Sequence, residues 1–136
     1  MKQINAYLHF SGNCREAMTF YKDCFGGELS FTTTGESPMA AQMPEMKDLI
    51  MHSVLTKDGL VLMASDMMDT ERATKGNNIS LCIIGANAEE LKPIFSKLSK
   101  GGEVTHELKT EFFGTYGDLT DKFGIAWMFQ ADNPKM

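Results

Sequence analysis

The chain has 136 residues, a formal net charge of −5 and 43% hydrophobic residues, as is typical of a globular domain. The acidic balance and the scattered Lys and Arg residues argue against nucleic-acid binding, and no apolar run approaches the roughly 18 residues of a membrane span. The start of the chain lacks the apolar segment of a signal peptide, and the three cysteines lack CxxC spacing. We therefore expect one cytoplasmic domain over residues 1–136, with neither a nucleic-acid nor a membrane partner.

The first predicted strand begins near residue 5. Its side chains alternate between a polar face (Asn5, Tyr7, His9) and an apolar face (Ala6, Leu8, Phe10). A helix should follow, with Asn13 as its N-cap and Glu16 at capping-box spacing. An apolar stripe is expected from Ala17 to Phe25, and the glycine pair 26–27 should end the helix.

Period-two patterns after this helix predict strands near 28–34, 50–56 and 60–66. The last two are joined across "KDG", whose Asp-Gly pair favours a tight hairpin. Met63 is expected on the polar face, together with Val61 and Ser65. The intervening segment, 34–48, is long enough to predict a lid or a binding loop.

The second half of the chain repeats the first. Residues 78–103 resemble residues 4–28, with Leu81 aligned with Leu8 and Cys82 with His9. In "NNISLCIIG", residues 77–85, the side chains of Asn78, Ser80 and Cys82 form the polar face of a predicted strand.

Asn87 and Glu90 repeat the capping spacing, and Pro93 should kink the second helix or delay its start. Strands are predicted near 103–107, 115–120 and 124–131, the last two around the turn "DKFG". Alternation places Met128 and Gln130 on the polar face and Trp127 on the apolar face. The two modules extend over about 1–70 and 75–136.

The polar faces permit two interpretations of similar weight. An antiparallel sheet often exposes one face to water. Alternatively, apolar walls with a few convergent polar groups are typical of a small-molecule cleft.

The combination of "GNCREAM", "FY" and "GG" in the first copy with "FGTYGDLTDKFGIAW" in the second resembles the vicinal oxygen chelate superfamily. This superfamily includes glyoxalase I, bleomycin-resistance proteins and extradiol dioxygenases. The chain is similar over nearly its whole length to the PhnB-like branch, often labelled 3-demethylubiquinone 3-methyltransferase-like. The resemblance implies an α+β fold of two tandem βαβββ modules that form a curved mixed sheet with the helices outside, commonly in a homodimer.

In metal-dependent members of this superfamily, His, Glu or Gln ligands lie on the first and last strands of each module. The resemblance places Asn5, Met63, Asn78 and Met128 at those positions. Neutral amides and thioethers are poor ligands for zinc, nickel or iron, so we predict no metal there and no other cofactor. The chain also lacks a glycine-rich strand-to-helix loop for S-adenosylmethionine.

The sequence offers weaker support for a functional role of several other residues. His9 and Cys82 could pair as base and nucleophile, and His9 with His52 and a carboxylate could hold a divalent metal; a structural role is the simpler interpretation of each. Tyr116, Asp118 and Asp121 lie close together in the sequence, and the paired acids could do acid-base work, but we expect Asp121 to cap its turn and Asp118 to face solvent. Phe112 and Phe113, after Glu111, are expected at a cleft mouth, at a dimer contact or in the core.

The leading hypothesis is a metal-free homodimer that binds a small, partly apolar organic ligand. The expected ligand-binding residues are Tyr7, His9, His52, Met63, Asn78 and Met128. The alternative is a metal-dependent lyase or dioxygenase-type enzyme with non-standard ligands. A third interpretation is a protein without a ligand, whose function lies in its dimer.

Overall fold

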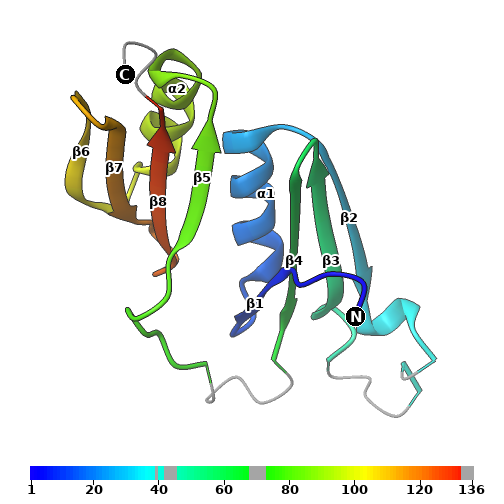
Figure 1. The fold of residues 1–136 in the computed structure, drawn as a ribbon. Coiled ribbons are helices and arrows are strands. Elements are labelled where there is room, and N and C mark those ends of the chain that lie inside the picture. The colour runs from blue at the N-terminus through cyan, green and yellow to red at the C-terminus, as the bar shows by residue number, and fades with distance from the viewer. Residues whose placement is uncertain (39, 42–45, 68–72, 133–136) are drawn as a thin grey trace. The chain divides into compact units, whose positions relative to one another are not determined.

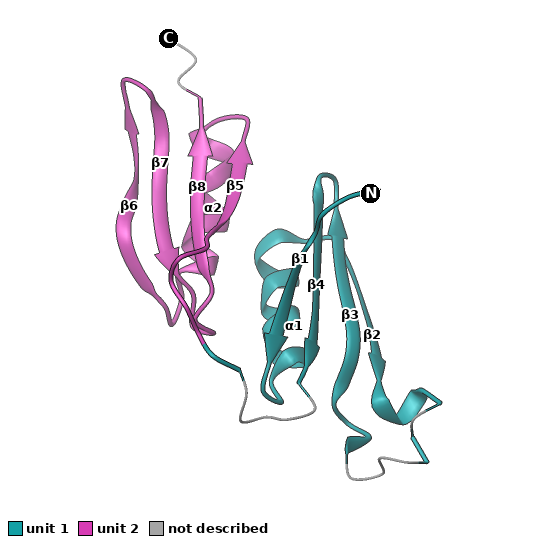
Figure 2. Cartoon of the chain, turned by 60° about the horizontal axis from the view of Figure 1, so that its bottom comes forward, with its two compact units in different colours: residues 1–74 teal, residues 75–136 magenta. Residues whose placement is uncertain are grey.

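The computed structural model describes residues 1–38, 40–41, 46–67 and 73–132. The chain forms two compact units, Met1–Thr74 and Lys75–Met136, which Figure 2 shows in different colours. Within the described part of the chain, neither helix has the length and apolar character needed to cross a membrane.

Unit 1 is a four-stranded mixed sheet with one α-helix. Its elements are β1 (Ala6–Phe10), α1 (Cys14–Phe25), β2 (Glu28–Thr33), a short 3-10 helix (Thr34–Glu36), β3 (Ile50–Lys57) and β4 (Leu60–Asp66). The strand order is β1-β4-β3-β2, with β1 parallel to β4 and the other neighbours antiparallel. Of the predicted 34–48 loop, residues 39 and 42–45 lie outside the described part.

Unit 2 repeats this topology. Its elements are β5 (Leu81–Gly85), α2 (Ala88–Leu98), β6 (Glu103–Glu111), β7 (Gly114–Thr120) and β8 (Ala126–Ala131). The strand order is β5-β8-β7-β6, with β5 parallel to β8. The predicted α+β class with two βαβββ modules is therefore confirmed, and each module has a four-stranded sheet of its own (Figure 1).

In each unit the helix packs on one face of the sheet (Figure 1). In unit 1, Met18 and Tyr21 of α1 are fully buried, as are Leu55 and Leu62 of the sheet. In unit 2, Phe95 of α2 packs edge-on against Phe129 at 5.0 Å between ring centroids. Gly117 makes room for this packing, because a Cβ atom there would lie 3.0 Å from the Phe95 ring. In the described part of each unit, no second α-helix covers the opposite face of the sheet.

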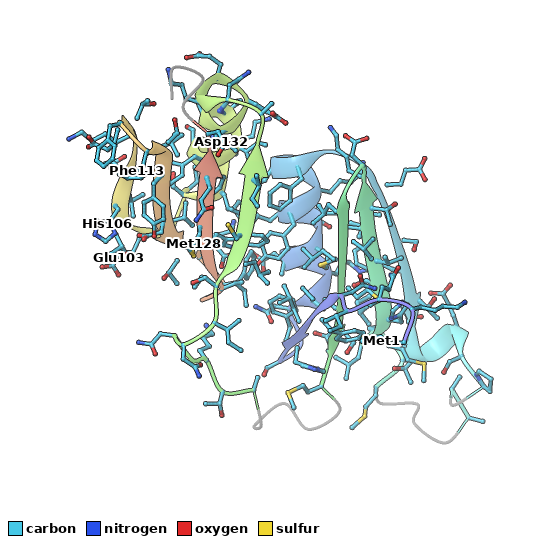
Figure 3. All side chains as sticks on the ribbon, in the orientation of Figure 1. Met1, Glu103, His106, Phe113, Met128 and Asp132 are labelled. Atoms are coloured by element: carbon cyan, nitrogen blue, oxygen red, sulfur yellow. The ribbon has the colours of Figure 1, made fainter. Side chains whose placement is uncertain are left out.

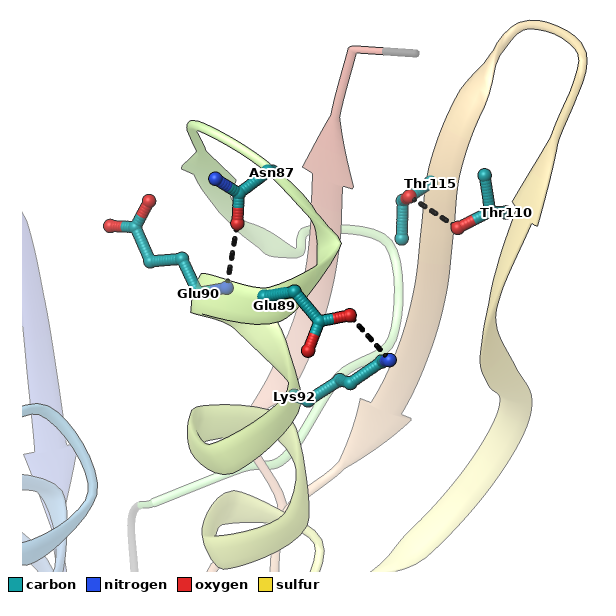
Figure 4. Close-up of polar contacts among 6 residues, drawn as sticks. All are labelled: Asn87, Glu89, Glu90, Lys92, Thr110 and Thr115. Carbon is teal, nitrogen blue, oxygen red and sulfur yellow. Dashed lines mark hydrogen bonds and ion pairs between the residues drawn. The ribbon is translucent and has the colours of Figure 1, made fainter. Parts of the chain in front are cut away.

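The two helices begin in different ways. The Asn87 side chain accepts a hydrogen bond from the Glu90 backbone N–H at 2.9 Å, as predicted (Figure 4). The Glu90 carboxylate accepts from the Ala86 N–H at 2.8 Å, one residue before the expected cap amide. Asn13 occupies the predicted N-cap position of α1, but its side chain makes no capping hydrogen bond.

The buried carboxylate of Asp66, and not the Asn13 side chain, caps the start of α1. One oxygen of Asp66, at the end of β4, accepts the N–H groups of Gly12 and Cys14 at 2.9 Å each. Its other oxygen accepts the N–H of Ile50 at 2.9 Å. Asp66 is more than 50 residues away in sequence from Gly12 and Cys14, so no local sequence pattern predicted this cap.

The hairpin turns follow the predicted chemistry. Asp58 adopts a positive φ of 48° in the turn between Lys57 and Leu60. The Asp121 carboxylate caps its own turn by accepting from Phe123 N–H at 2.8 Å and Ile125 N–H at 3.1 Å. Its other oxygen accepts from the Trp127 indole at 2.8 Å, which ties the turn to the core of unit 2.

Some predicted boundaries were wrong. The strand expected over 77–85 begins only at Leu81, because residues 77–80 are exposed and lie outside the sheet. The strand expected at 103–107 continues to Glu111, where it pairs with Gly114 across a turn formed by Phe112 and Phe113. The last strand begins at 126 and not 124. Pro93 does not delay α2, which begins at Ala88.

Candidate functional site

The face of the unit 1 sheet that lies opposite α1 carries a cluster of aromatic and imidazole rings. Along the sheet, Tyr7 lies beside Met63, and His9 lies beside Ser65. The neighbouring positions on β4, Leu62 and Ala64, are buried toward α1. Alternation along the strands therefore turns this set away from the helix, as the sequence pattern predicted.

Tyr7 is the centre of this cluster. Its ring centroid lies 5.3 Å from that of His9 and 5.9 Å from that of His52. The Tyr7 hydroxyl is 3.3 Å from Nδ1 of His52, within hydrogen-bonding distance. Tyr7 is 39% exposed, and both histidines are exposed. The rings therefore present both flat apolar surface and hydrogen-bonding groups to solvent.

Four of the six predicted ligand-binding residues thus come together on unit 1: Tyr7, His9, His52 and Met63. The other two belong to unit 2. Asn78 is exposed and precedes β5, so it is not part of the sheet. Met128 lies on β8, in a row of side chains whose other members were not predicted to bind the ligand.

That row crosses all four strands of unit 2. Cys82 pairs with Met128, Met128 with Asp118, and Asp118 with His106. Figure 3 labels His106 and Met128 on this sheet. Asp118 accepts a hydrogen bond from the Tyr116 hydroxyl at 2.5 Å and lies 3.0 Å from Nδ1 of His106.

Asp118 was expected to face solvent, and this was wrong: only 20% of its side chain is exposed. Burial disfavours its charge, but the hydrogen bonds from Tyr116 and His106 outweigh burial and hold the pKa of Asp118 below its ordinary value. The hydrogen bond to Asp118, with burial, raises the pKa of Tyr116 to about 12. Tyr116 therefore remains a hydrogen-bond donor at neutral pH. The sequence pattern did not single out His106 as a site residue, because its partner Asp118 lies on the neighbouring strand β7.

The strand register also corrects the alignment of the two copies. Tyr7 pairs with Met63, and Cys82 pairs with Met128, so Tyr7 is the counterpart of Cys82. His9 corresponds instead to Ile84, which is 77% exposed. The predicted equivalence of His9 and Cys82 was wrong by two positions. Because side chains alternate with period two, this error left every residue on its predicted face.

The four positions predicted to be degenerate metal sites do not form a set of divalent-metal ligands. Met63 and Met128 offer thioethers, Asn5 and Asn78 offer amides, and Asn78 lies outside the sheet. Among the residues that the structure describes, no group of three or more His, Cys, Asp or Glu side chains is placed to hold a metal ion. The donors present therefore do not fit zinc, nickel or iron.

The cysteines differ in accessibility. Cys14, the first residue of α1, is fully buried, with its sulfur 3.6 Å from the Ser53 hydroxyl, and burial raises the pKa of its thiol to about 11. A thiol in this state is a poor nucleophile. Cys82 is exposed on the helix-free face of unit 2.

The aromatic pair at 112–113 forms the tip of the β6–β7 hairpin. Phe112 is 81% exposed and Phe113 51% exposed, so the core interpretation was wrong for both. Their rings pack edge-on at 5.4 Å between centroids. Glu111 pairs with Lys109 at 3.3 Å. This tip keeps apolar surface exposed at one end of unit 2.

Two tandem βαβββ units are the architecture of the glyoxalase-like fold. The sequence profile of the family described as 3-demethylubiquinone-9 3-methyltransferase matches residues 2–130. The chain therefore belongs to this family, the PhnB-like branch of the vicinal oxygen chelate superfamily, as its motifs predicted.

Individual relatives agree with this assignment. Protein YjdN of Escherichia coli (strain K12) is 30% identical over 139 residues, covering 94% of both chains. The structure of PA1353 from Pseudomonas aeruginosa is similar with a TM-score of 0.84 and 35% identity, over 97% of this chain and 98% of that one.

The PhnB protein from Bacillus cereus gives a TM-score of 0.76 and 26% identity, over 96% and 99% of the two chains. A glyoxalase-related enzyme from Fulvimarina pelagi gives 0.65 and 17% identity, over 98% and 90%, and this last match shows the fold alone.

Proposed function

We propose that this protein binds a small, partly apolar organic molecule on the helix-free face of unit 1, without a metal ion. The observation that carries the proposal is the exposed cluster of Tyr7, His9 and His52. Flat rings bind planar or apolar ligand surface, and the hydroxyl and imidazole groups at their edges orient polar ligand groups.

Met63 adds a feature that a merely solvated sheet face does not need. This half-buried thioether lies beside Tyr7 on the same row. A flexible, polarisable side chain adjusts to ligands of different shape and packs favourably against aromatic rings. Together with Val54, which pairs with Met63, it forms an apolar floor next to the polar rings.

No observation favours the metal-dependent lyase or dioxygenase alternative, since the described residues provide no suitable ligand set. Elemental mass spectrometry tests this part of the proposal. Untagged protein, purified without chelators and then offered zinc, nickel, manganese and ferrous iron, should retain none of them after dialysis. One ion per chain that survives dialysis would contradict the metal-free proposal.

The family description names a methyltransferase, but the described strand-to-helix turns lack the glycine-rich loop that commonly binds S-adenosylmethionine. Neither strand-to-helix turn is a glycine-rich loop: β1 leads to α1 through Ser11, Gly12 and Asn13, and β5 leads to α2 through Ala86 and Asn87. At the start of α1, the N–H groups of Gly12 and Cys14 donate hydrogen bonds to Asp66. Ligand binding is therefore the function that we propose.

A thermal-shift screen of small aromatic and heteroaromatic compounds tests the ligand proposal. A hit should stabilise the wild type and lose most of its effect in Tyr7→Ala. Tyr7→Phe keeps the ring and should retain part of the effect. Lys22→Ala, on the exposed side of α1, is the matched control and should behave as wild type. Hits that are equal in all four proteins, or no hits at all, would refute the proposal.

We further propose that the chain acts as a cytoplasmic homodimer. The exposed Phe112–Phe113 tip supports an interface, because aromatic anchors contribute disproportionately to association. Analytical ultracentrifugation should show a dimer for the wild type and a weaker dimer for Phe112→Ser. A monomer at all concentrations would contradict this part. A dimer together with an empty ligand screen would favour the dimer itself as the function.

A further inference from the structure

Unit 2 contains a second group of titratable side chains that the proposed function does not use. His106 of β6 lies directly opposite Asp118 of β7. Nδ1 of His106 is 3.0 Å from one oxygen of Asp118 and 3.1 Å from the other. The Tyr116 hydroxyl donates a hydrogen bond of 2.5 Å to the same carboxylate. The carboxylate is thus held between a phenol and an imidazole.

This arrangement fixes where the protons are. The pKa of Asp118 lies below its ordinary value, so the carboxyl is ionised at neutral pH and only accepts hydrogen bonds. Nδ1 of His106 must therefore carry a hydrogen to donate. In the neutral imidazole the opposite nitrogen, Nε2, then has a free lone pair and is a hydrogen-bond acceptor.

The surroundings of this acceptor suit a partly apolar ligand. The His106 side chain is 67% exposed and that of Asp118 only 20%, so the imidazole is the more accessible partner of the pair. The same row continues through Met128 to Cys82, two polarisable sulfur-containing side chains on the helix-free face. The Tyr116 ring lies 6.4 Å from the His106 ring between centroids.

We propose that His106, oriented by Asp118 and Tyr116, is the hydrogen-bond-accepting centre of a second ligand site, for a small, partly apolar molecule with an acidic hydroxyl group such as a phenol or an enol. Where that hydroxyl is acidic enough, its proton passes to Nε2, the O–H electron pair stays on the ligand oxygen, and Asp118 stabilises the imidazolium. His106 contacts the ligand, while Asp118 and Tyr116 are positioning residues.

The first test measures the tautomer of His106 by ¹⁵N NMR of the imidazole nitrogens. Only three histidines are present, so single His→Gln variants assign the signals. The neutral ring of His106 should carry its hydrogen on Nδ1. Asp118→Leu, which removes the acceptor but keeps the size of the side chain, should move the hydrogen to Nε2. A wild-type His106 with its hydrogen on Nε2 would overturn the proposal.

The second test titrates the protein with phenol, with anisole as the matched compound that lacks the hydroxyl. Phenol should shift the Nε2 signal of His106 and anisole should not. His106→Ala should abolish binding at this site, and Asp118→Leu should weaken it by roughly tenfold, as expected for loss of a charge-assisted hydrogen bond. Tyr116→Phe should weaken it less, by roughly threefold.

Folding and independence from unit 1 have their own controls. The ¹H–¹⁵N spectrum of each variant shows whether unit 2 remains folded, and Lys109→Ala on the same strand should bind phenol as the wild type does. Tyr7→Ala removes the centre of the unit 1 cluster and should leave the His106 response unchanged. Equal responses to phenol and anisole, or no response of His106 to millimolar phenol, would overturn the proposal.

Discussion

Among the described residues, each unit contains one buried aspartate that accepts at least three hydrogen bonds, but the two aspartates lie at opposite ends of the last strand of their units. Asp66 closes β4 and binds the N–H groups that start α1 and β3, far away in sequence. Asp121 precedes β8 and binds groups within its own turn and the indole of Trp127. In unit 2, Ala131 occupies the position of Asp66.

This difference shows that one topology tolerates different polar anchors. Where the long-range carboxylate is missing, α2 is capped locally by Asn87, with Glu90 bound to the preceding amide. In unit 1 the β3–β4 hairpin is a tight Asp-Gly turn, which forms without a buried carboxylate to hold it. A buried donor must be satisfied, but either a neighbour in sequence or a distant strand can supply the acceptor.

Replacing Asp66 should have the largest effect. Asp66→Ala leaves three backbone N–H groups without their acceptor and should lower the free energy of unfolding by about 4 kcal/mol. Urea unfolding followed by circular dichroism measures this change. Asp23→Ala, at an exposed position on α1, is the control and should change stability by less than about 0.5 kcal/mol. A small loss in Asp66→Ala would mean that water replaces the carboxylate without cost.

Asp121→Ala should cost about 3 kcal/mol, because the N–H groups of Phe123 and Ile125 and the indole of Trp127 lose their acceptor. Trp127 is the only tryptophan in the chain, so its fluorescence reports directly on unit 2. The emission should shift to the red in Asp121→Ala and stay unchanged in the folded Asp66→Ala protein. A red shift in both would contradict the assignment of the effect of Asp66 to unit 1 alone.

The helix caps give a smaller contrast. Asn87→Ala should lower the free energy of unfolding by about 1 kcal/mol, because the Glu90 N–H loses its acceptor. Asn13→Ala should cost less than about 0.5 kcal/mol, because its side chain makes no capping bond. The same urea experiment measures both. Equal losses would contradict the distinction between a local and a tertiary cap.

The smallest expected effect concerns acid stability. Since the pKa of Asp118 is lowered in the folded protein, its ionisation stabilises the fold fully above the ordinary value of 3.8. This contribution is lost as the pH falls through the lower pKa of the folded state. Tyr116→Phe removes one of the hydrogen bonds and should raise that pKa toward 3.8. A ¹³C NMR titration of the Asp118 carboxyl measures the shift, and an unchanged pKa would contradict the role given to Tyr116.

Much of the fold was predictable because its determinants are local. Alternation of side chains gave the strands and their faces, and the predicted 60–66 strand agrees with the observed Leu60–Asp66. The glycine pairs and the Asp-Gly turn marked where elements end, because few other residues adopt a positive φ. The internal repeat predicted the two modules. The two-position misalignment of the copies left each residue on its predicted face of the sheet.

The sequence by itself therefore determined the strand and helix segments, the two faces of each sheet, the turn capped by Asp121 and the family. Only the tertiary structure decided which distant groups meet: Asp66 with the start of α1, Tyr7 with His52, and His106 with Asp118. These pairs depend on strand order and register. Register is set by the packing of whole strands against a helix, and no short stretch of sequence records it.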